Sequence, residues 1–284
     1  GFDACGAAPA GALLREGACL QQWLAAGRHA GMGYMARNVE KRIDVRLLAP
    51  GARSVFMLLM SYKPAAVQPV ALPQVAYYAY GEDYHDVIRR KLKALEDVVR
   101  THYPRAQVRT FVDSAPVFEK AWAARAGLGW VGKNNLLVSP VFGSFVFLAA
   151  LVTEAELLYD EPLESRCGNC ERCVAACPTG ALEAPRRFDA QKCISYQNKH
   201  KDETADAIHG YLFGCDLCQL SCPWNKAAPA HAHSDLTPLP EIMSYTAADW
   251  LALDETQFNR IFAHSPLRRS GLKKIQENAR KIKP

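Results

Sequence analysis

Hydrophobic and polar positions alternate in blocks along the first 155 residues. Four short apolar runs lie at 55–60, 108–112, 136–138 and 145–152. Their length and their content of Val, Leu and Phe predict buried strands. Between 88 and 99 the apolar residues instead recur every three or four positions, which predicts an amphipathic helix capped by Asp83. Strands and helices that alternate in this way predict an α/β or α+β fold around a sheet of about four or five strands.

The neighbouring segments carry simpler patterns. Residues 1–50 have apolar positions at helical spacing and predict helix followed by loop. A further helix is expected from Pro116 to Ala126, ended by Gly127. The glycine-rich loop 127–135 matches no phosphate-loop template, so a nucleotide site is not expected there.

Two cysteine runs follow this first part of the chain. The first run has the spacing C-x2-C-x2-C-x3-C-P and the second repeats it with its first cysteine moved upstream. The eight cysteines are Cys167, Cys170, Cys173, Cys177, Cys193, Cys215, Cys218 and Cys222. Bacterial-type ferredoxins bind [4Fe–4S] clusters with this spacing, and the fourth cysteine of each run ligates the other cluster. The sequence therefore predicts a ferredoxin-like part with two [4Fe–4S] clusters.

Exchange of the fourth ligands assigns each cysteine to a cluster. The first cluster would be bound by Cys167, Cys170, Cys173 and Cys222. The second would be bound by Cys177, Cys193, Cys215 and Cys218. Structural zinc and disulfides are the alternatives, but structural zinc favours two separated C-x2-C pairs and disulfide scaffolds are usually much smaller chains.

Composition and charge indicate in which compartment the protein functions. The chain has 284 residues, 49% of them hydrophobic, and a formal net charge of +5. Thiolate ligands need a reducing compartment, no apolar run is long enough to span a membrane, and no signal peptide is apparent. We therefore expect a cytoplasmic protein without membrane contact, in which Cys5 and Cys19 are ordinary core or surface thiols.

Basic residues accumulate at the end of the chain. From Arg260 onward eight Lys and Arg stand against the single acidic residue Glu277. Such a segment is either a solvated helix face or a surface that binds phosphate.

Several short motifs carry a resemblance to a known family. They are Gly33-Tyr-Met-Ala-Arg37, Tyr80-Gly-x-Asp-Tyr-His85, Val112-Asp-Ser-x-Pro116, Ala126-Gly-Leu-Gly-Trp-x-Gly-Lys-Asn134 and Cys193-Ile-Ser-Tyr-x-Asn-Lys199. In this order, and with the eight cysteines, they resemble the epoxyqueuosine reductases from about residue 1 to residue 275. The helical-repeat extension that some members of this family carry is not seen.

The resemblance implies a fold and a reaction. It implies an α+β fold with an α/β-like N-terminal domain shared with reductive dehalogenases, binding cobalamin, followed by the two-cluster domain. The expected boundaries are 1–155 for the cobalamin domain, 156–226 for the cluster domain and 227–284 for a helical basic segment. The reaction implied is reduction of epoxyqueuosine to queuosine in a tRNA anticodon loop. No cobalamin-box motif is present, so cobalamin rests on the resemblance.

The resemblance also implies roles for individual residues. Asp113 matches the family's proton donor, which would need a raised pKa; the alternative is a helix cap ahead of Pro116. Cobalamin contacts are expected from Arg37, Asn134 and Leu137, and from Ser195 and Asp216 on the cluster side, with Asp113 nearby. His85 is either part of this site or a core histidine.

The expected partners are a tRNA, an unidentified electron donor and no second copy of the chain. Phosphate contacts are expected from the pair Arg186-Arg187, from residues 199–201 and from the basic end of the chain. Two other functions fit the cysteine runs. One is a corrinoid reductive dehalogenase of small organohalides, and the other is a plain ferredoxin-like electron-transfer protein.

Overall fold

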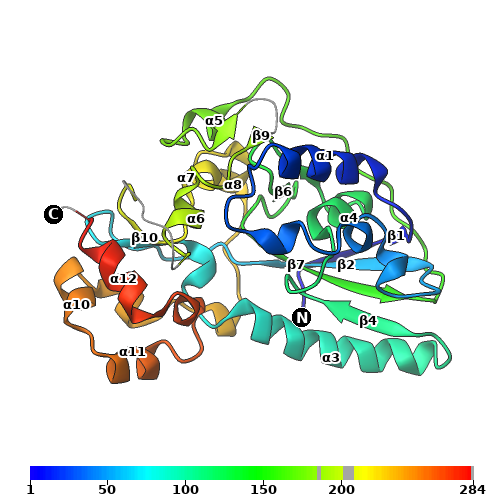
Figure 1. Ribbon diagram of the computed structural model, residues 1–284. Coiled ribbons are helices and arrows are strands. Elements are labelled where there is room, and N and C mark those ends of the chain that lie inside the picture. Colours follow the sequence, from blue (N-terminus) through cyan, green and yellow to red (C-terminus); the bar gives the residue numbers. More distant parts are fainter. Residues whose placement is uncertain (184–186, 201–207, 283–284) are drawn as a thin grey trace.

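A four-stranded antiparallel sheet forms the centre of the N-terminal part. The structure, a computed structural model, describes residues 1–183, 187–200 and 208–282 (Figure 1). The strand order is β1-β2-β7-β4, with β1 at Ala4–Pro9, β2 at Ser54–Ser61, β7 at Val146–Thr153 and β4 at Val108–Phe111. Every pair in this sheet is antiparallel. The mixed fold predicted from the sequence is confirmed, in its α+β form.

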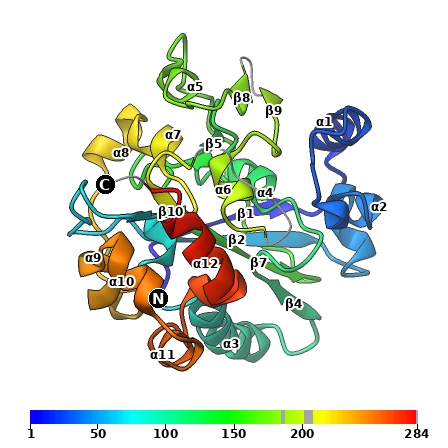
Figure 2. The same ribbon diagram turned by 60° about the vertical axis from the view of Figure 1, so that its left-hand side comes forward.

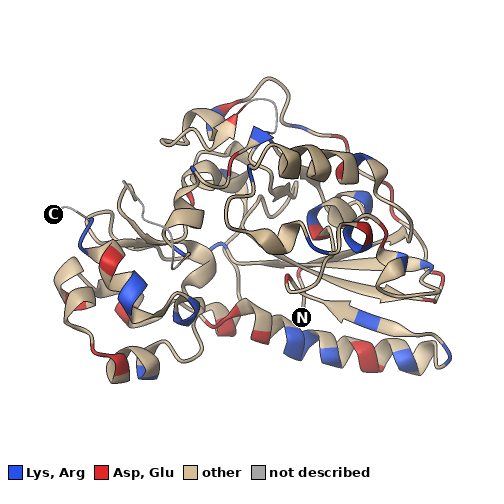
Figure 3. Cartoon of the chain, in the orientation of Figure 1, with Lys and Arg blue, Asp and Glu red and all other residues tan. Residues whose placement is uncertain are grey.

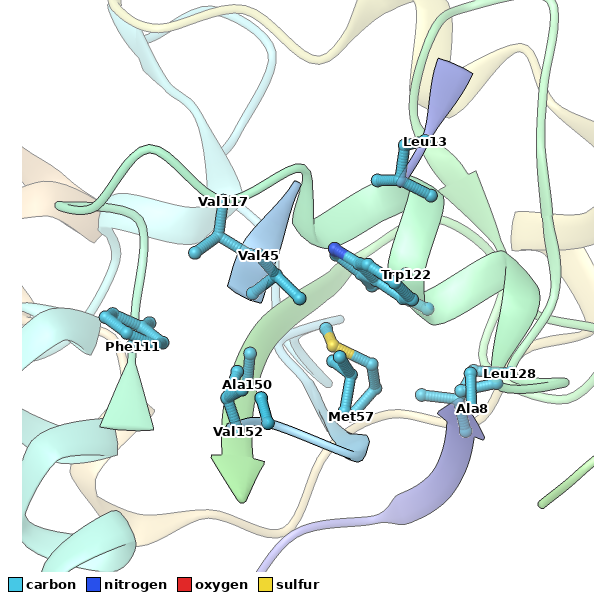
Figure 4. Packing of buried hydrophobic residues seen from close by; sticks show 14 of the residues in the cluster. Ala8, Leu13, Val45, Met57, Phe111, Val117, Trp122, Leu128, Ala150 and Val152 are labelled. Atoms are coloured by element: carbon cyan, nitrogen blue, oxygen red, sulfur yellow. The ribbon is translucent and has the colours of Figure 1, made fainter. Parts of the chain in front are cut away.

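Both faces of this sheet are buried, which explains its unbroken apolar runs. Alternate residues of β2 point to opposite faces. Met57 packs with Trp122 and Val152 in one core (Figure 4). Leu58 packs with Ile88 in the core on the other face. The sheet therefore lies between helices, as a strand with two apolar faces requires.

Helices cover the two faces. α1 (Leu14–Ala25), α2 (Val39–Ile43) and α4 (Glu119–Arg125) lie on one side of the sheet, and α3 (Tyr84–His102) lies on the other (Figure 1). The Asp83 carboxylate accepts a hydrogen bond from the His85 backbone N–H, which confirms the predicted cap of α3. α4 begins at Glu119 rather than at Pro116, so residues 116–118 remain in the preceding loop.

Strand β1 is the main departure from the predicted elements, because residues 1–50 were expected to be helix and loop. Its sequence, Ala-Cys-Gly-Ala-Ala-Pro, has no β-branched or aromatic residue that would signal a strand. Gly6 allows β1 to approach the end of α4, since a Cβ there would collide with the carbonyl oxygen of Ala126. The small residues are thus selected by close packing against the end of α4.

The apolar run at 136–138 forms a separate hairpin. β5 (Trp130–Val131) pairs antiparallel with β6 (Leu137–Val138), outside the central sheet. The glycine-rich loop is therefore partly extended, and it lies between α4 and the cysteine runs.

The cysteine runs form short elements that pack together (Figure 2). These are α5 (Arg172–Ala175), β8 (Leu182–Glu183), β9 (Arg187–Phe188), α6 (Ile194–Gln197), β10 (Tyr211–Phe213), α7 (Leu217–Leu220) and α8 (Pro223–Ala227). β10 pairs parallel with β3 (Gln74–Val75). Trp23 Nε1 donates to the Phe188 carbonyl at 2.7 Å, and the Gly31 N–H donates to Tyr196 Oη at 2.7 Å. The cysteine segment is thereby fixed to the N-terminal part.

The C-terminal segment is helical, as predicted. It contains α9 (Pro240–Ser244), α10 (Ala247–Ala252), α11 (Glu255–Ile261) and α12 (Gly271–Ala279). Trp250 and Phe262 of this segment share a core with Tyr80 and Leu212. The three-part division of the chain stays a prediction, since this core joins residues from all three parts. None of the helices in the described ranges is long and apolar enough to cross a membrane.

Candidate active site

A cavity of about 760 Å³ opens beside α4. Its wall comes from the segment around Tyr34 and Arg37, from the loop 113–118 and from β5. Residues from these elements that line it include Tyr34, Arg37, Asp113, Glu119, Val131 and Asn135. This volume lies within the range of about 300–1,000 Å³ typical of ligand sites. The cavity brings Arg37 and Asp113, both singled out from the sequence, to one place.

Asp113 lies in the turn that follows β4, with a backbone φ of +51°. Its side chain is 57% exposed. Tyr84 Oη donates a hydrogen bond of 2.5 Å to Asp113 Oδ2, and the Asp113 N–H donates to Glu119 Oε1 at 2.6 Å. Positive φ is uncommon outside glycine and is found at sites where a side chain has a required direction. The turn therefore directs the carboxylate into the cavity instead of capping α4, which begins six residues later.

His85 connects this carboxylate to the start of α3. The residue is 5% exposed. Its Nδ1 lies 2.8 Å from Asp83 Oδ1, and its Nε2 lies 3.5 Å from Asp113 Oδ2. Arg269 donates to Asp83 Oδ2 through Nε at 3.0 Å and Nη2 at 2.7 Å, and its Nη2 is also 2.9 Å from His85 Nδ1. His85 is thus buried and at the same time faces the site.

The pKa of Asp113 differs from the value expected from the sequence. The hydrogen bond with His85, helped by the one from Tyr84, lowers the pKa of Asp113 to about 2 and outweighs the partial desolvation of the carboxylate by the cavity wall. The sequence-based expectation of a raised pKa is therefore wrong for this geometry. Burial lowers the pKa of His85, but its hydrogen bonds to Asp113 and Asp83 outweigh this and raise it above 6.5. Asp113 is therefore ionised near neutral pH, and the protonated form is favoured on the neighbouring His85 instead.

Glu119 was not singled out from the sequence, where it is one acidic residue at a helix start. Burial, and then the nearby charge of Asp113, raise the pKa of Glu119 to about 8. The Glu119 carboxyl is therefore largely protonated at neutral pH. It is a second proton-carrying group in contact with the Asp113 backbone.

Two amides present donors without partners. Asn134 Nδ2 and Asn135 Nδ2 are buried and make no hydrogen bond within the described residues. Asn135 lines the cavity and has a φ of +59°. Buried donors without partners are rare in native proteins, and a bound ligand is one explanation. These donors and the cavity fit a large ligand that is rich in hydrogen-bond acceptors, such as a corrinoid with amide side chains.

The other predicted cobalamin contacts lie in different surroundings. Leu137 is buried in the same core cluster as Trp122 of α4. Ser195 is half-buried in α6, two residues after Cys193. Asp216 is buried and accepts hydrogen bonds from the Tyr77 N–H at 2.7 Å and from Gln219 Nε2 at 2.9 Å. Burial raises the pKa of Asp216 to about 6. Their contact with cobalamin stays a prediction.

The eight cysteines have free thiols, so none of them forms a disulfide. Burial raises the pKa of the Cys222 thiol, and so does the proximity of Cys167 and Cys170. Burial likewise raises the pKa of Cys215 to about 12, helped by Cys193 and Cys177. Cys218 is affected by Cys215 and Cys193, and also by Cys173 of the other expected group. The assignment of the eight cysteines to two clusters therefore stays a prediction.

Within residues 1–183, 187–200 and 208–282, no three His, Cys, Asp or Glu side chains converge closely enough to hold a single metal ion. Structural zinc is held by four ligands around one ion, whereas the ligands of a [4Fe–4S] cluster are four Cys thiolates around a larger body. Eight cysteines are the number of ligands that two such clusters need.

The residues predicted to contact tRNA phosphates differ in how exposed they are. Lys199 points inward, with Nζ 5.4 Å from the centroid of the Tyr78 ring, and burial lowers its pKa. Arg187 is exposed in β9, while Arg186 and Lys201 lie outside the described residues. On α3 basic residues are interspersed with acidic ones (Figure 3). The phosphate contacts stay predictions, and Lys199 lies close enough to Asp113 for each to affect the pKa of the other.

Comparisons with known proteins agree on one family. The family model described as "Epoxyqueuosine reductase QueG, DUF1730" matches residues 42–114, and the "4Fe-4S double cluster binding domain" matches residues 166–225. A curated epoxyqueuosine reductase of Cellulophaga algicola is 38% identical over 98% of this chain and 92% of its own length. A second one, of Cyclobacterium marinum, is 40% identical over 100% of this chain and 93% of its own length.

Solved structures give the same result. A crystal structure of epoxyqueuosine reductase with an epoxyqueuosine-modified tRNA-Tyr stem loop aligns with a TM-score of 0.91 at 33% identity, covering 98% of this chain and 76% of the other. The Bacillus subtilis enzyme, solved with a catalytic aspartate loop swung out of its active site, aligns with a TM-score of 0.90 at 32% identity, with the same coverage.

Proposed function

Because the chain belongs to the epoxyqueuosine reductase family, we propose that it forms queuosine in a tRNA anticodon loop at the cavity beside Asp113. The chain is an oxidoreductase with an iron–sulfur domain. The observation that carries the location is the position of the Asp113 carboxylate in the cavity, hydrogen-bonded to Tyr84 and adjacent to His85. Conversion of the epoxide to the alkene consumes two electrons and two protons and releases the oxygen as water.

The proposed cofactors are two [4Fe–4S] clusters and cobalamin. The grouping of the free thiols supports the two clusters. The buried amide donors of Asn134 and Asn135 and the nearby Arg37 support a corrinoid in the cavity. Cobalamin, when bound, would supply low-potential electrons from the clusters to the substrate carbon.

Protons would reach the leaving oxygen through Asp113. Its carboxylate is ionised in this geometry, so it needs a neighbour that carries a proton at neutral pH. His85 Nε2 lies 3.5 Å from Asp113 Oδ2, and hydrogen bonds to Asp113 and Asp83 raise the pKa of His85, which favours the form of the ring that carries the proton. Substrate and cofactor would also exclude water from the exposed carboxylate, which raises a carboxyl pKa. Asp113 thus delivers to the oxygen a proton that His85 holds.

The modified base would enter the cavity splayed out of the anticodon loop, as is usual where proteins act on RNA bases. Exposed Lys and Arg around the cavity would bind phosphates and make binding fall with salt. We further propose a cytoplasmic monomer that receives electrons from a separate donor protein.

The test is turnover by anaerobically reconstituted protein. Epoxyqueuosine-containing tRNA is incubated with the protein and a strong reductant, with and without cobalamin, and the nucleosides are identified by mass spectrometry. We expect queuosine only when cobalamin is present. If queuosine forms equally well without it, the cobalamin proposal is wrong; if none forms although both cofactors are bound, the substrate is wrong.

A further inference from the structure

The indole of Trp130 donates a hydrogen bond to a predicted cluster ligand. Trp130 Nε1 lies 3.4 Å from Cys167 Sγ, within the range allowed for a donor to sulfur. Trp130 is 2% exposed, so water competes little for this donor. A buried indole N–H nearly always has a partner, and here the partner is the first cysteine of the first run.

The strand that carries Trp130 separates the cysteines from the cavity. β5 has only two residues, Trp130 and Val131, and Val131 lines the cavity. Successive side chains of a strand point to opposite faces. The Trp130 side chain therefore faces the cysteines while its neighbour faces the proposed substrate and cofactor site.

Packing holds the indole in place independently of the sulfur. Trp130 is paired with Val138 in the β5–β6 hairpin. Gly129 allows this pairing, because a Cβ there would collide with the Val138 carbonyl oxygen. The Trp130 ring also meets Trp224 edge to face, with ring centroids 5.0 Å apart and an interplanar angle of 78°. Trp224 follows Cys222 by two residues, so the indole contacts the first proposed ligand of one cluster and a close chain neighbour of its last.

We propose that Trp130 is a positioning residue that raises the reduction potential of the cluster bound by Cys167. The inference rests on the proposed pair of clusters. A cluster gains one negative charge when it is reduced, and hydrogen bonds to its sulfur ligands stabilise that charge. The effect is larger where water is excluded, as it is around this indole. Electrons would therefore be favoured on the cluster next to the cavity.

A redox titration tests this without tRNA or cobalamin. Wild-type protein, Trp130→Phe and Trp224→Phe are reconstituted anaerobically, their iron and sulfide are counted, and their clusters are followed by electron paramagnetic resonance at stepped potentials. Trp130→Phe removes the donor and keeps an aromatic ring. Trp224→Phe is the matched control, because it changes the neighbouring ring and leaves the hydrogen bond to Cys167.

We expect Trp130→Phe to lower one of two midpoint potentials and to leave the other unchanged, while Trp224→Phe shifts neither. Unchanged potentials in fully loaded Trp130→Phe overturn the inference. If this variant loses iron, β-(3-benzothienyl)alanine at position 130 replaces the N–H by sulfur at nearly constant shape. The same downward shift is then expected, and its absence overturns the inference. Wild-type protein that holds fewer than two clusters would instead contradict the proposed cofactor set.

Discussion

His85 Nε2 lies 3.5 Å from Asp113 Oδ2, although the two residues come from the first turn of α3 and from the turn after β4. Asp83, which caps α3, holds the other ring nitrogen at 2.8 Å. The imidazole is therefore oriented from one side and faces the Asp113 carboxylate on the other. Arg269, from the C-terminal segment, fixes Asp83 in turn. Residues far apart in the sequence thus converge on one proton-carrying group.

Replacement of His85 by Gln should alter the pH dependence of turnover. The pKa of His85 is raised above 6.5, so its proton is present below that raised pKa and is lost as the pH rises through it. Wild-type turnover should therefore decline on the alkaline side. Gln cannot carry the proton, and we expect turnover to fall by about 10²-fold or more at neutral pH with the alkaline decline flattened.

His102→Gln, at the exposed end of the same helix, is the matched control and should leave the profile unchanged. The measurement is single-turnover queuosine formation between pH 6 and pH 9. An alkaline limb that is the same in His85→Gln and in wild type contradicts the role of His85.

Glu119→Gln should stabilise the protein at alkaline pH. The pKa of Glu119 is raised to about 8 in the folded protein from 4.5, so folding retains a proton that the unfolded chain releases between these values. Stability contributed by the neutral carboxyl is therefore lost progressively as the pH rises through this window. Gln keeps the acceptor for the Asp113 N–H and has no charge, so its advantage in the free energy of unfolding should grow to on the order of 4 kcal/mol by about pH 8.5.

Thermal unfolding of the two proteins at pH 5 and pH 8.5 measures this difference. If the variant and wild type have the same melting temperature as each other at pH 5 and again at pH 8.5, the Glu119 carboxyl is not held neutral.

Asn198→Ala should loosen the second cysteine group. Asn198 is fully buried, and its amide donates to the Tyr211 carbonyl at 3.0 Å and to the Gly214 carbonyl at 2.8 Å. It also accepts from the Gly214 N–H at 3.0 Å, next to Cys215. Loss of these bonds leaves buried groups unsatisfied and should cost about 2–4 kcal/mol.

We expect the iron content of Asn198→Ala to fall towards that of one cluster, with a lower melting temperature. Asn259→Ala, on the exposed side of α11, is the control and should behave as wild type. If Asn198→Ala keeps the iron content and the melting temperature of wild type, the hydrogen bonds of Asn198 do not support the cysteine ligands.

Asn135→Gly should weaken cobalamin binding. Asn135 lines the cavity, its Nδ2 lacks a partner, and its φ of +59° suits glycine without strain. If this amide donates to bound cobalamin, its loss should lower affinity by about tenfold, because a hydrogen bond contributes about 1 kcal/mol or somewhat more. Equilibrium titration followed by absorbance gives the affinity, and iron content serves as the internal control. Equal affinity would place the ligand elsewhere.

The sequence predicts the central sheet well because burial dictates it. The runs that become β2 and β7 are apolar on both faces, and cores containing Met57 and Leu58 cover the two sides. β1 could not be predicted, since its small residues are selected by contact with the end of α4 and not by strand propensity. Cysteine spacing is equally informative, because ligand geometry restricts it locally.

From the sequence, the residues of the candidate site could be identified only where they belong to a recognisable motif. Asp113 was found by resemblance, but the direction of its pKa depends on Tyr84 and His85, which reach it only in the folded protein. Glu119 gave no signal, because a Glu at a helix start is common. Trp130 belongs to the glycine-rich motif 126–134, but the motif assigns it no role of its own. Their roles follow from neighbours that lie far away in the chain.

Single-turnover reduction of epoxyqueuosine tRNA by Asp113→Asn tests the central claim most directly. The variant keeps the size of the side chain and removes the ionisable group at the cavity. We expect both clusters and cobalamin to be retained, and queuosine formation to fall by about 10²-fold or more. Wild-type rates in Asp113→Asn with full cofactor content would contradict the claim that the proton reaches the leaving oxygen through Asp113.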